Sequence, residues 1–125
     1  MSSPASSAAQ TVLPVLKNFI NGQYVPSSTN NTFDNIDPVT GEVFSIVHEA
    51  SERDVDSAVR AARAAFTGEW GALTVDARVT LLQKVADRIN ERFDEFLQAE
   101  CRDTGKPYSL ARHVDIPRGA ANFKV

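Results

Sequence analysis

The period of the hydrophobic pattern changes near Ser51, and no other feature of the sequence constrains the fold as strongly. Before Ser51, short segments rich in aromatic and β-branched residues are separated by Gly, Pro and Asn, as is typical of strands and turns. After Ser51, apolar residues recur every three or four positions, which indicates amphipathic helices. We therefore expect an α/β chain in which an antiparallel β-hairpin layer is followed by amphipathic helices.

Two strand pairs are expected in the first part of the chain. Residues 18–20 and 23–25 flank Asn21-Gly22, a pair that readily adopts the positive φ angles of a type I′ turn. After a polar loop, strand-like segments that contain Phe33 and Ile36, and then residues 43–47, are joined by a turn with Pro38 and Gly41. These segments predict antiparallel pairing throughout.

Two helices are expected after the strands. Ser51 is suited to cap the first, with Asp54 three residues later as in a capping box, and Gly68 is expected to end it. Thr74 is expected to cap a second helix that runs without a break to Gly105. Its roughly 30 residues would form a rod of roughly 45 Å, so part of its apolar face is expected to pack on further protein.

Both ends of the chain differ from its middle. Residues 1–16 are rich in Ser and Ala and low in charge, which predicts a flexible tail before one truncated domain portion over residues 17–125. Pro117 is expected to kink the last apolar segment or to begin a new turn after Asp115. The chain halts at Val125 without a helix-ending residue, which favours truncation.

Composition and charge argue against several classes of function. The 125 residues are 42% hydrophobic and 23% charged, which is typical of one soluble globular unit. A formal net charge of −3 is too small to recruit nucleic acid or an anionic membrane, and no segment approaches the roughly 20 apolar residues of a membrane span. The absence of a signal-peptide pattern and the single cysteine favour the cytoplasm.

Cys101 is the only thiol that could serve as a nucleophile. A nucleophilic cysteine needs a lowered pKa from a base, a cation or a helix N-terminus. Cys101 is expected near the C-terminal end of a helix, beside Glu100 and Asp103, with only Arg102 to favour the thiolate. An ordinary half-buried thiol is therefore expected.

The other polar candidates also favour structural roles. The spacing of His48 and His113 does not match that of any zinc site. The carboxylates of Glu91, Asp94 and Glu95 are expected on the solvated face of the long helix. Residues 104–107 lack the upstream glycines and the following hydroxyl of a phosphate loop, so they predict a helix stop, and Trp70 is expected to pack between helices. By residue chemistry alone, the chain contains no active site.

Four motifs together resemble the opening of the aldehyde dehydrogenase superfamily, in order and in spacing. They occupy residues 19–22, 37–43, 54–66 and 103–107, and the resemblance covers residues 17–125. Within the family, residues 92–101 and 115–123 are similar to those of 2-hydroxymuconic and 2-aminomuconic semialdehyde dehydrogenases.

The resemblance implies that this chain is the N-terminal part of a Rossmann-like NAD-binding domain in a longer, homo-oligomeric enzyme. In such enzymes a cysteine thiolate attacks the aldehyde, hydride passes to NAD, and a glutamate activates water to release the acid. The resemblance also implies that the catalytic cysteine and glutamate lie further along, so Cys101 is not that cysteine.

One site of the family maps partly onto this chain. Many relatives hold a monovalent cation with two backbone carbonyls and an aspartate, and these would correspond to Asn35, Ile36 and Asp103. A further ligand comes from later sequence, so weak binding is expected here. Alternatively, Asp103 only helps to end the helix and to cap nearby amides.

The sequence thus supports two hypotheses of function. The first is an inactive piece of an NAD-dependent dehydrogenase that acts on a muconate-type semialdehyde. The second is a non-catalytic truncated module that docks on full-length subunits through its exposed helix faces.

Overall fold

The computed structural model describes residues 12–124, in which strands precede helices along the chain. The elements follow in this order: β1 (Val15–Leu16), β2 (Asn18–Ile20), β3 (Gln23–Val25), β4 (Thr32–Ile36), β5 (Val43–His48), α1 (Glu52–Thr67), α2 (Glu69–Ala72), α3 (Val75–Glu91), α4 (Phe93–Thr104), α5 (Tyr108–Leu110), the π-helix η1 (Ala111–Asp115) and α6 (Ile116–Ala121). The expected α/β chain is confirmed. Residues 1–11 of the predicted tail lie outside the described residues.

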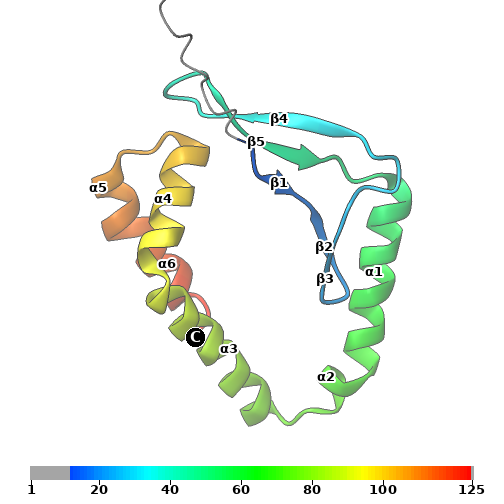
Figure 1. Ribbon diagram of the computed structural model, residues 1–125. Helices are drawn as coiled ribbons and strands as arrows, with labels where there is room; N and C mark the ends of the chain where they lie inside the picture. The colour runs from blue at the N-terminus through cyan, green and yellow to red at the C-terminus, as the bar shows by residue number, and fades with distance from the viewer. Residues whose placement is uncertain (1–11, 125) are drawn as a thin grey trace, which may run out of the picture.

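Strands β1, β5 and β4 form a three-stranded sheet in that order (Figure 1). β4 and β5 are antiparallel, and in their turn the Asp37 amide donates to the Glu42 carbonyl at 2.9 Å. β1, however, pairs with β5 in the parallel direction. The prediction of antiparallel pairing throughout is wrong here, because a two-residue strand leaves no local pattern and depends on a distant partner. β1 also falls within residues 1–16, which were expected to form a flexible tail.

Strands β2 and β3 form the predicted hairpin. Asn21 and Gly22 both have positive φ angles, 51° and 78°, as a type I′ turn requires. The rings of Phe19 and Tyr24 lie 5.0 Å apart across the two strands. The hairpin lies beside α1 (Figure 1). Small residues of α1, among them Ala58, line a shallow pocket together with hairpin residues.

The N-terminal cap of α1 also fixes the loop over residues 26–31. The Ser51 hydroxyl accepts from the Asp54 amide at 3.2 Å and the Asp54 carboxylate accepts from the Ser51 amide at 2.9 Å, which confirms the capping box. The same carboxylate accepts from the Ser28 amide at 3.1 Å and from the Ser27 hydroxyl at 3.3 Å. The Ser51 amide, followed by that of Ser28, holds the pKa of Asp54 well below its ordinary value.

This low pKa predicts an acid-sensitive fold. Because folding lowers the pKa of Asp54, its contribution to stability is complete above the unfolded value of about 3.8 and is lost as the pH falls below it. Asp54→Asn should therefore lower the melting temperature at neutral pH, and its difference from the wild type should shrink in acid. Circular dichroism melts over a pH series measure both effects.

The matched control is Asp56→Asn, on the same helix. Asp56 is exposed and reaches Arg60 at only 3.8 Å. Its replacement should change neither the neutral melting temperature nor the acid response by much, since exposed pairs contribute little. A difference between Asp54→Asn and the wild type that stays constant into acid would contradict the role of the Asp54 charge.

The helix boundaries after α1 are confirmed in part. Gly68 ends α1, and the Thr74 hydroxyl caps α3 by accepting from the Ala77 amide at 3.2 Å. The short helix α2 between them was not predicted. It carries Trp70, whose side chain is 36% exposed.

The predicted single helix from Thr74 to Gly105 is wrong, because it is interrupted at Arg92. This residue has φ −103° and ψ 27°, outside the helical region, and it separates α3 from α4. Arginine is a good helix former, so the apolar stripe alone could not reveal the break. After the break, Leu97 of α4 lies in one buried cluster with Ile116 of α6.

A small apolar core lies among helices α3 to α6. Its buried residues are Leu97, Ala111 and Ile116, and Ile89, Phe93 and Cys101 pack around them. The π-helix η1 closes when the Ile116 amide donates to the Ala111 carbonyl. α6 then begins after Asp115 with Pro117 in its first turn, as predicted.

Strands β1, β4 and β5 pack mainly on one another, and so do helices α3 to α6. In Figure 1 the helices α3 to α6 gather on one side, α1 and the β2–β3 hairpin lie on the other, and the sheet lies across the top. Many large apolar side chains stay exposed, among them Tyr24 and Phe66 at 73% and 72%. The apolar face predicted for α1 is thus left largely uncovered by the described residues.

Candidate functional site

The candidate site lies where the end of α4 meets β4 and the turn that follows it. The Asn35 side-chain amide donates to the Asp103 carboxylate at 2.8 Å, although the two residues are 68 positions apart. Two residues further on, Gly105 ends α4 with φ 71° and lies directly against Pro38. The sheet and the helical part of the chain therefore meet through a polar contact and a close backbone approach.

The structure brings together the residues predicted to hold a cation. Asn35 and Asp103 are hydrogen-bonded, and Ile36 follows Asn35 in β4. The β4–β5 register shifts between Asn35 and Ile36, and such an irregularity leaves backbone groups outside the ladder. Backbone carbonyls and a carboxylate are the ligand types that hard cations prefer. The donor types that the resemblance implies for a monovalent cation, two backbone carbonyls and one carboxylate, therefore occur on adjoining elements.

Asp103 carries a charge that no described basic side chain neutralises. Within residues 12–124 its carboxylate accepts from Asn35, and no helix-end amide or basic group is bonded to it. The neighbouring cations are engaged elsewhere. The Arg102 guanidinium lies 4.6 Å from the centre of the Phe44 ring, and Lys106 pairs with other carboxylates.

Lys106 lies between two carboxylates just after the turn. Its ammonium is 3.1 Å from Glu100 of α4 and 3.1 Å from Asp115 of η1. The close ion pair with Asp115, followed by the hydrogen bond to Glu100, raises the pKa of Lys106 above its ordinary value. The residue is therefore a charged brace and not an amine available as a base.

A groove of about 630 Å³ runs between the sheet and α4 beside this site. Apolar atoms form most of its exposed lining, with Leu16 and Phe44 on the sheet side and Phe96 on the helix side. Ser45 also lines the groove, is 2% exposed, and its hydroxyl finds no partner among the described residues. The groove thus combines apolar surface with the buried Ser45 hydroxyl and with charged side chains, among them Glu100, Arg102 and Asp103.

Sequence reasoning missed the roles of Ser45 and Lys106. Ser45 interrupts the apolar run of residues 43–47, and that interruption is the one local signal that could have marked it. Lys106 gives no signal, because its partners depend on how η1 folds back on α4.

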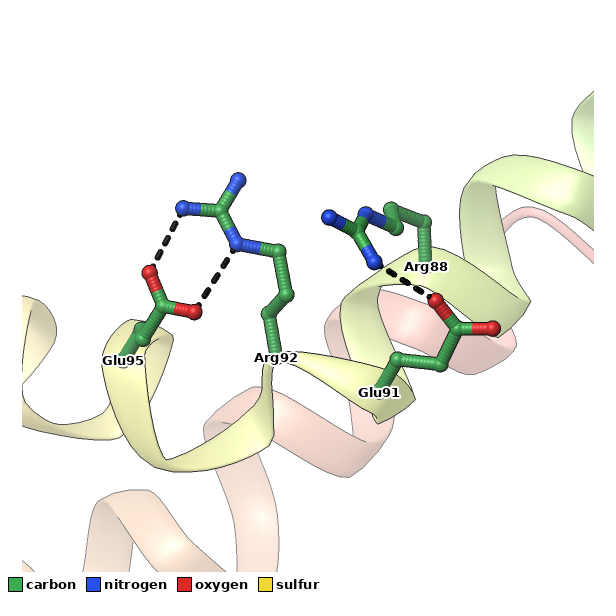
Figure 2. A network of polar contacts seen from close by, with 4 residues as sticks. All are labelled: Arg88, Glu91, Arg92 and Glu95. Atoms are coloured by element: carbon green, nitrogen blue, oxygen red, sulfur yellow. Dashed lines mark hydrogen bonds and ion pairs between the residues drawn. The ribbon is translucent and has the colours of Figure 1, made fainter.

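The remaining candidates occupy structural positions. Cys101 is half-buried beside the core, as predicted. Figure 2 shows Arg88 paired with Glu91, and Arg92 with Glu95 through two parallel hydrogen bonds of 3.0 and 2.6 Å. These side chains are exposed, which confirms the solvated face expected for the carboxylates.

The histidines lie in different parts of the fold. The His113 ring contacts the Ser109 carbonyl at 2.7 Å, whereas His48 ends β5. No group of three His, Cys, Asp or Glu residues suited to a metal ion occurs among residues 12–124. In the same part of the chain, no helix is both long and apolar enough to cross a bilayer.

The fold and the sequence together define the class of protein. A sequence profile described as the aldehyde dehydrogenase family matches residues 24–125. Solved aldehyde dehydrogenases superpose closely: the chain from Bacillus cereus, described as an NAD+ complex, has a TM-score of 0.84 and 42% sequence identity. That alignment covers 87% of this chain and 22% of the other. The chain belongs to the aldehyde dehydrogenase family.

Two of the similar proteins are semialdehyde dehydrogenases. The chain is 58% identical over 110 residues to a 2-hydroxymuconic semialdehyde dehydrogenase of Pseudomonas sp. strain CF600, in an alignment that covers 88% of this chain and 23% of that protein. It is 46% identical over 108 residues to a 2-aminomuconic 6-semialdehyde dehydrogenase of Pseudomonas sp., covering 86% and 22%. The chain thus spans between a fifth and a quarter of the length of these relatives.

Proposed function

We propose that the chain forms the N-terminal part of an NAD-dependent dehydrogenase that oxidises a muconic-type semialdehyde to the acid. The identity of 58% to a 2-hydroxymuconic semialdehyde dehydrogenase carries this proposal. The NAD+ complex of a relative that shares the fold supports the cofactor. In this proposal the parent enzyme is a homo-oligomer in the cytoplasm.

We propose that the chain alone is inactive. Its single cysteine, Cys101, is half-buried and packs beside Leu97 near the C-terminal end of α4. With NAD and 2-hydroxymuconic semialdehyde, the purified chain should give no absorbance of reduced nicotinamide, whereas a full-length relative should give it. If the chain does produce reduced nicotinamide, and the Cys101→Ser variant produces it as well, the activity comes from a site other than Cys101.

The uncovered apolar side chains support a second function, docking on subunits of a related dehydrogenase. Phe66 on α1 and Tyr24 on the hairpin are the most exposed large examples in these two elements. Adding the chain to a full-length relative should then change the mass of the relative in light scattering. If the mass stays unchanged at high chain concentration, docking is contradicted, and the first proposed function, the N-terminal part of a dehydrogenase, remains.

We also propose that the carbonyls of Asn35 and Ile36 and the carboxylate of Asp103 hold a monovalent cation. The register shift at Asn35 and the unneutralised charge of Asp103 support this site. The ion would supply positive charge that ties β4 to the end of α4, without taking part in oxidation. Lacking a ligand from elsewhere, the site should be weak in this chain.

A further inference from the structure

The tip of the β2–β3 hairpin carries the only Asn-Gly pair in the sequence. Asn21 and Gly22 form the turn between Ile20 and Gln23, which are paired across the two strands. Both turn residues are exposed. Asparagine is one of the thermolabile residues, and its side-chain amide can be attacked by the backbone nitrogen of the next residue. The turn therefore presents a reactive amide to water.

The nitrogen that would attack this amide, that of Gly22, is unobstructed. Glycine has no Cβ that could shield its nitrogen, and the space where a Cβ would lie is open. In the described part of the chain, the Gly22 amide donates no hydrogen bond. The attack on Asn21 therefore meets no side chain at this nitrogen and breaks no hydrogen bond there.

Asn30 provides a contrast within the same chain. It is also exposed and also has a positive φ angle, 59°. The nitrogen that would attack it belongs to Asn31, which carries a side chain and donates to a threonine hydroxyl at 3.4 Å. Elsewhere, the side-chain amide of Asn35 is bonded to Asp103, and that of Asn18 is buried. The structure thus distinguishes the asparagine of the hairpin turn from these others.

We propose that Asn21 is a site of spontaneous deamidation. The Gly22 nitrogen forms a bond to Cγ of Asn21, its proton passes to the side-chain amide, and the Cγ–Nδ2 bond breaks to release ammonia. This leaves a five-membered succinimide. Water then opens the ring at either of its two carbonyls, which gives aspartate or β-linked isoaspartate at position 21. Water is the only co-reactant.

The isoaspartate product would change the hairpin. Its β-linkage places one more carbon in the main chain, so the turn no longer has the geometry of a two-residue type I′ turn. That turn sets the pairing of the strands, across which the rings of Phe19 and Tyr24 lie 5.0 Å apart. The hairpin also lines a shallow pocket with small residues of α1. Deamidation should therefore loosen the hairpin and its contact with α1.

The test is incubation of the folded 125-residue chain in ¹⁸O-labelled water at mildly alkaline pH, followed by peptide mapping in a mass spectrometer. Ring opening places one labelled oxygen at each deamidated position. Most of the label should lie at residue 21, and little at Asn30. Part of the product at residue 21 should be a substrate for an isoaspartate methyltransferase, which does not act on ordinary aspartate.

Asn21→Gly removes the reactive amide and keeps the turn, because Gly-Gly also adopts type I′ geometry. This variant should lose the label at that position and retain the proton contacts between the Phe19 and Tyr24 rings in NMR spectra throughout the incubation. The wild type should lose these contacts as isoaspartate accumulates. Asn30→Gly is the matched control, and it should leave the labelling of residue 21 unchanged.

The chain unfolded in urea gives the rate of labelling without the turn. If the folded wild type stays unlabelled at residue 21, the proposal is wrong, and labelling of the unfolded chain would show that the turn protects Asn21. Equal labelling of Asn21 and Asn30 in the folded chain would also contradict the proposal, because the open nitrogen of Gly22 would then have no effect.

Discussion

Replacing Leu97 with alanine is expected to lower the free energy of unfolding of the helical part by about 2–5 kcal/mol. Leu97 is completely buried and contacts the core that Ala111 and Ile116 share. Its removal leaves a cavity between α4, η1 and α6, which such a small core has little material to refill. Urea unfolding followed by circular dichroism at the helical band measures the loss.

The control for this cavity is Leu110→Ala, one element further along the chain. Leu110 is of the same type, but its side chain is 47% exposed, so its truncation removes less buried area and creates no enclosed cavity. Leu110→Ala should lower the free energy of unfolding clearly less than Leu97→Ala does. Equal losses at the two positions would mean that the cluster around Leu97 does not hold the helices together.

Replacing Gly105 with alanine should be the most damaging change at the candidate site. The φ angle of 71° places a non-glycine residue in the left-handed region, which costs about 1–2 kcal/mol. A new Cβ would also lie 2.9 Å from Cγ of Pro38, and forced overpacking costs about 1–3 kcal/mol more. Thermal and urea unfolding should both show this loss.

Gly41→Ala separates the two causes. Gly41 has a similar φ of 74°, and its surroundings are open where a Cβ would lie. It should therefore show the backbone strain alone, while Gly105→Ala shows strain and clash. If both substitutions lower the free energy of unfolding by the same amount, the contact between Gly105 and Pro38 is loose, and the turn does not pack tightly on the sheet.

The sequence predicted those elements whose causes are local. The capping box at Ser51, the positive φ angles at Asn21 and Gly22, and the stop at Gly105 all depend on residues within a few positions of one another. Each of these was confirmed. The break at Arg92 and the π-helix η1 could not be predicted, because both depend on how α4 packs against segments that come later in the sequence.

The candidate site shows the same limit. Asn35 and Asp103 lie 68 positions apart, and nothing in the composition of either segment indicates that they meet. Only the resemblance to a family pointed to both. The brace at Lys106 was missed even so, because the family motifs do not indicate that Glu100 and Asp115 converge on it.

The narrow junction between the sheet and the helices has a consequence for cooperativity. Few contacts cross it beyond those around Asn35, Arg102 and Gly105, so little free energy couples the two parts. Units coupled so weakly open separately, each with its own equilibrium constant. Amide hydrogens of α4 and of β5 would then exchange through different openings.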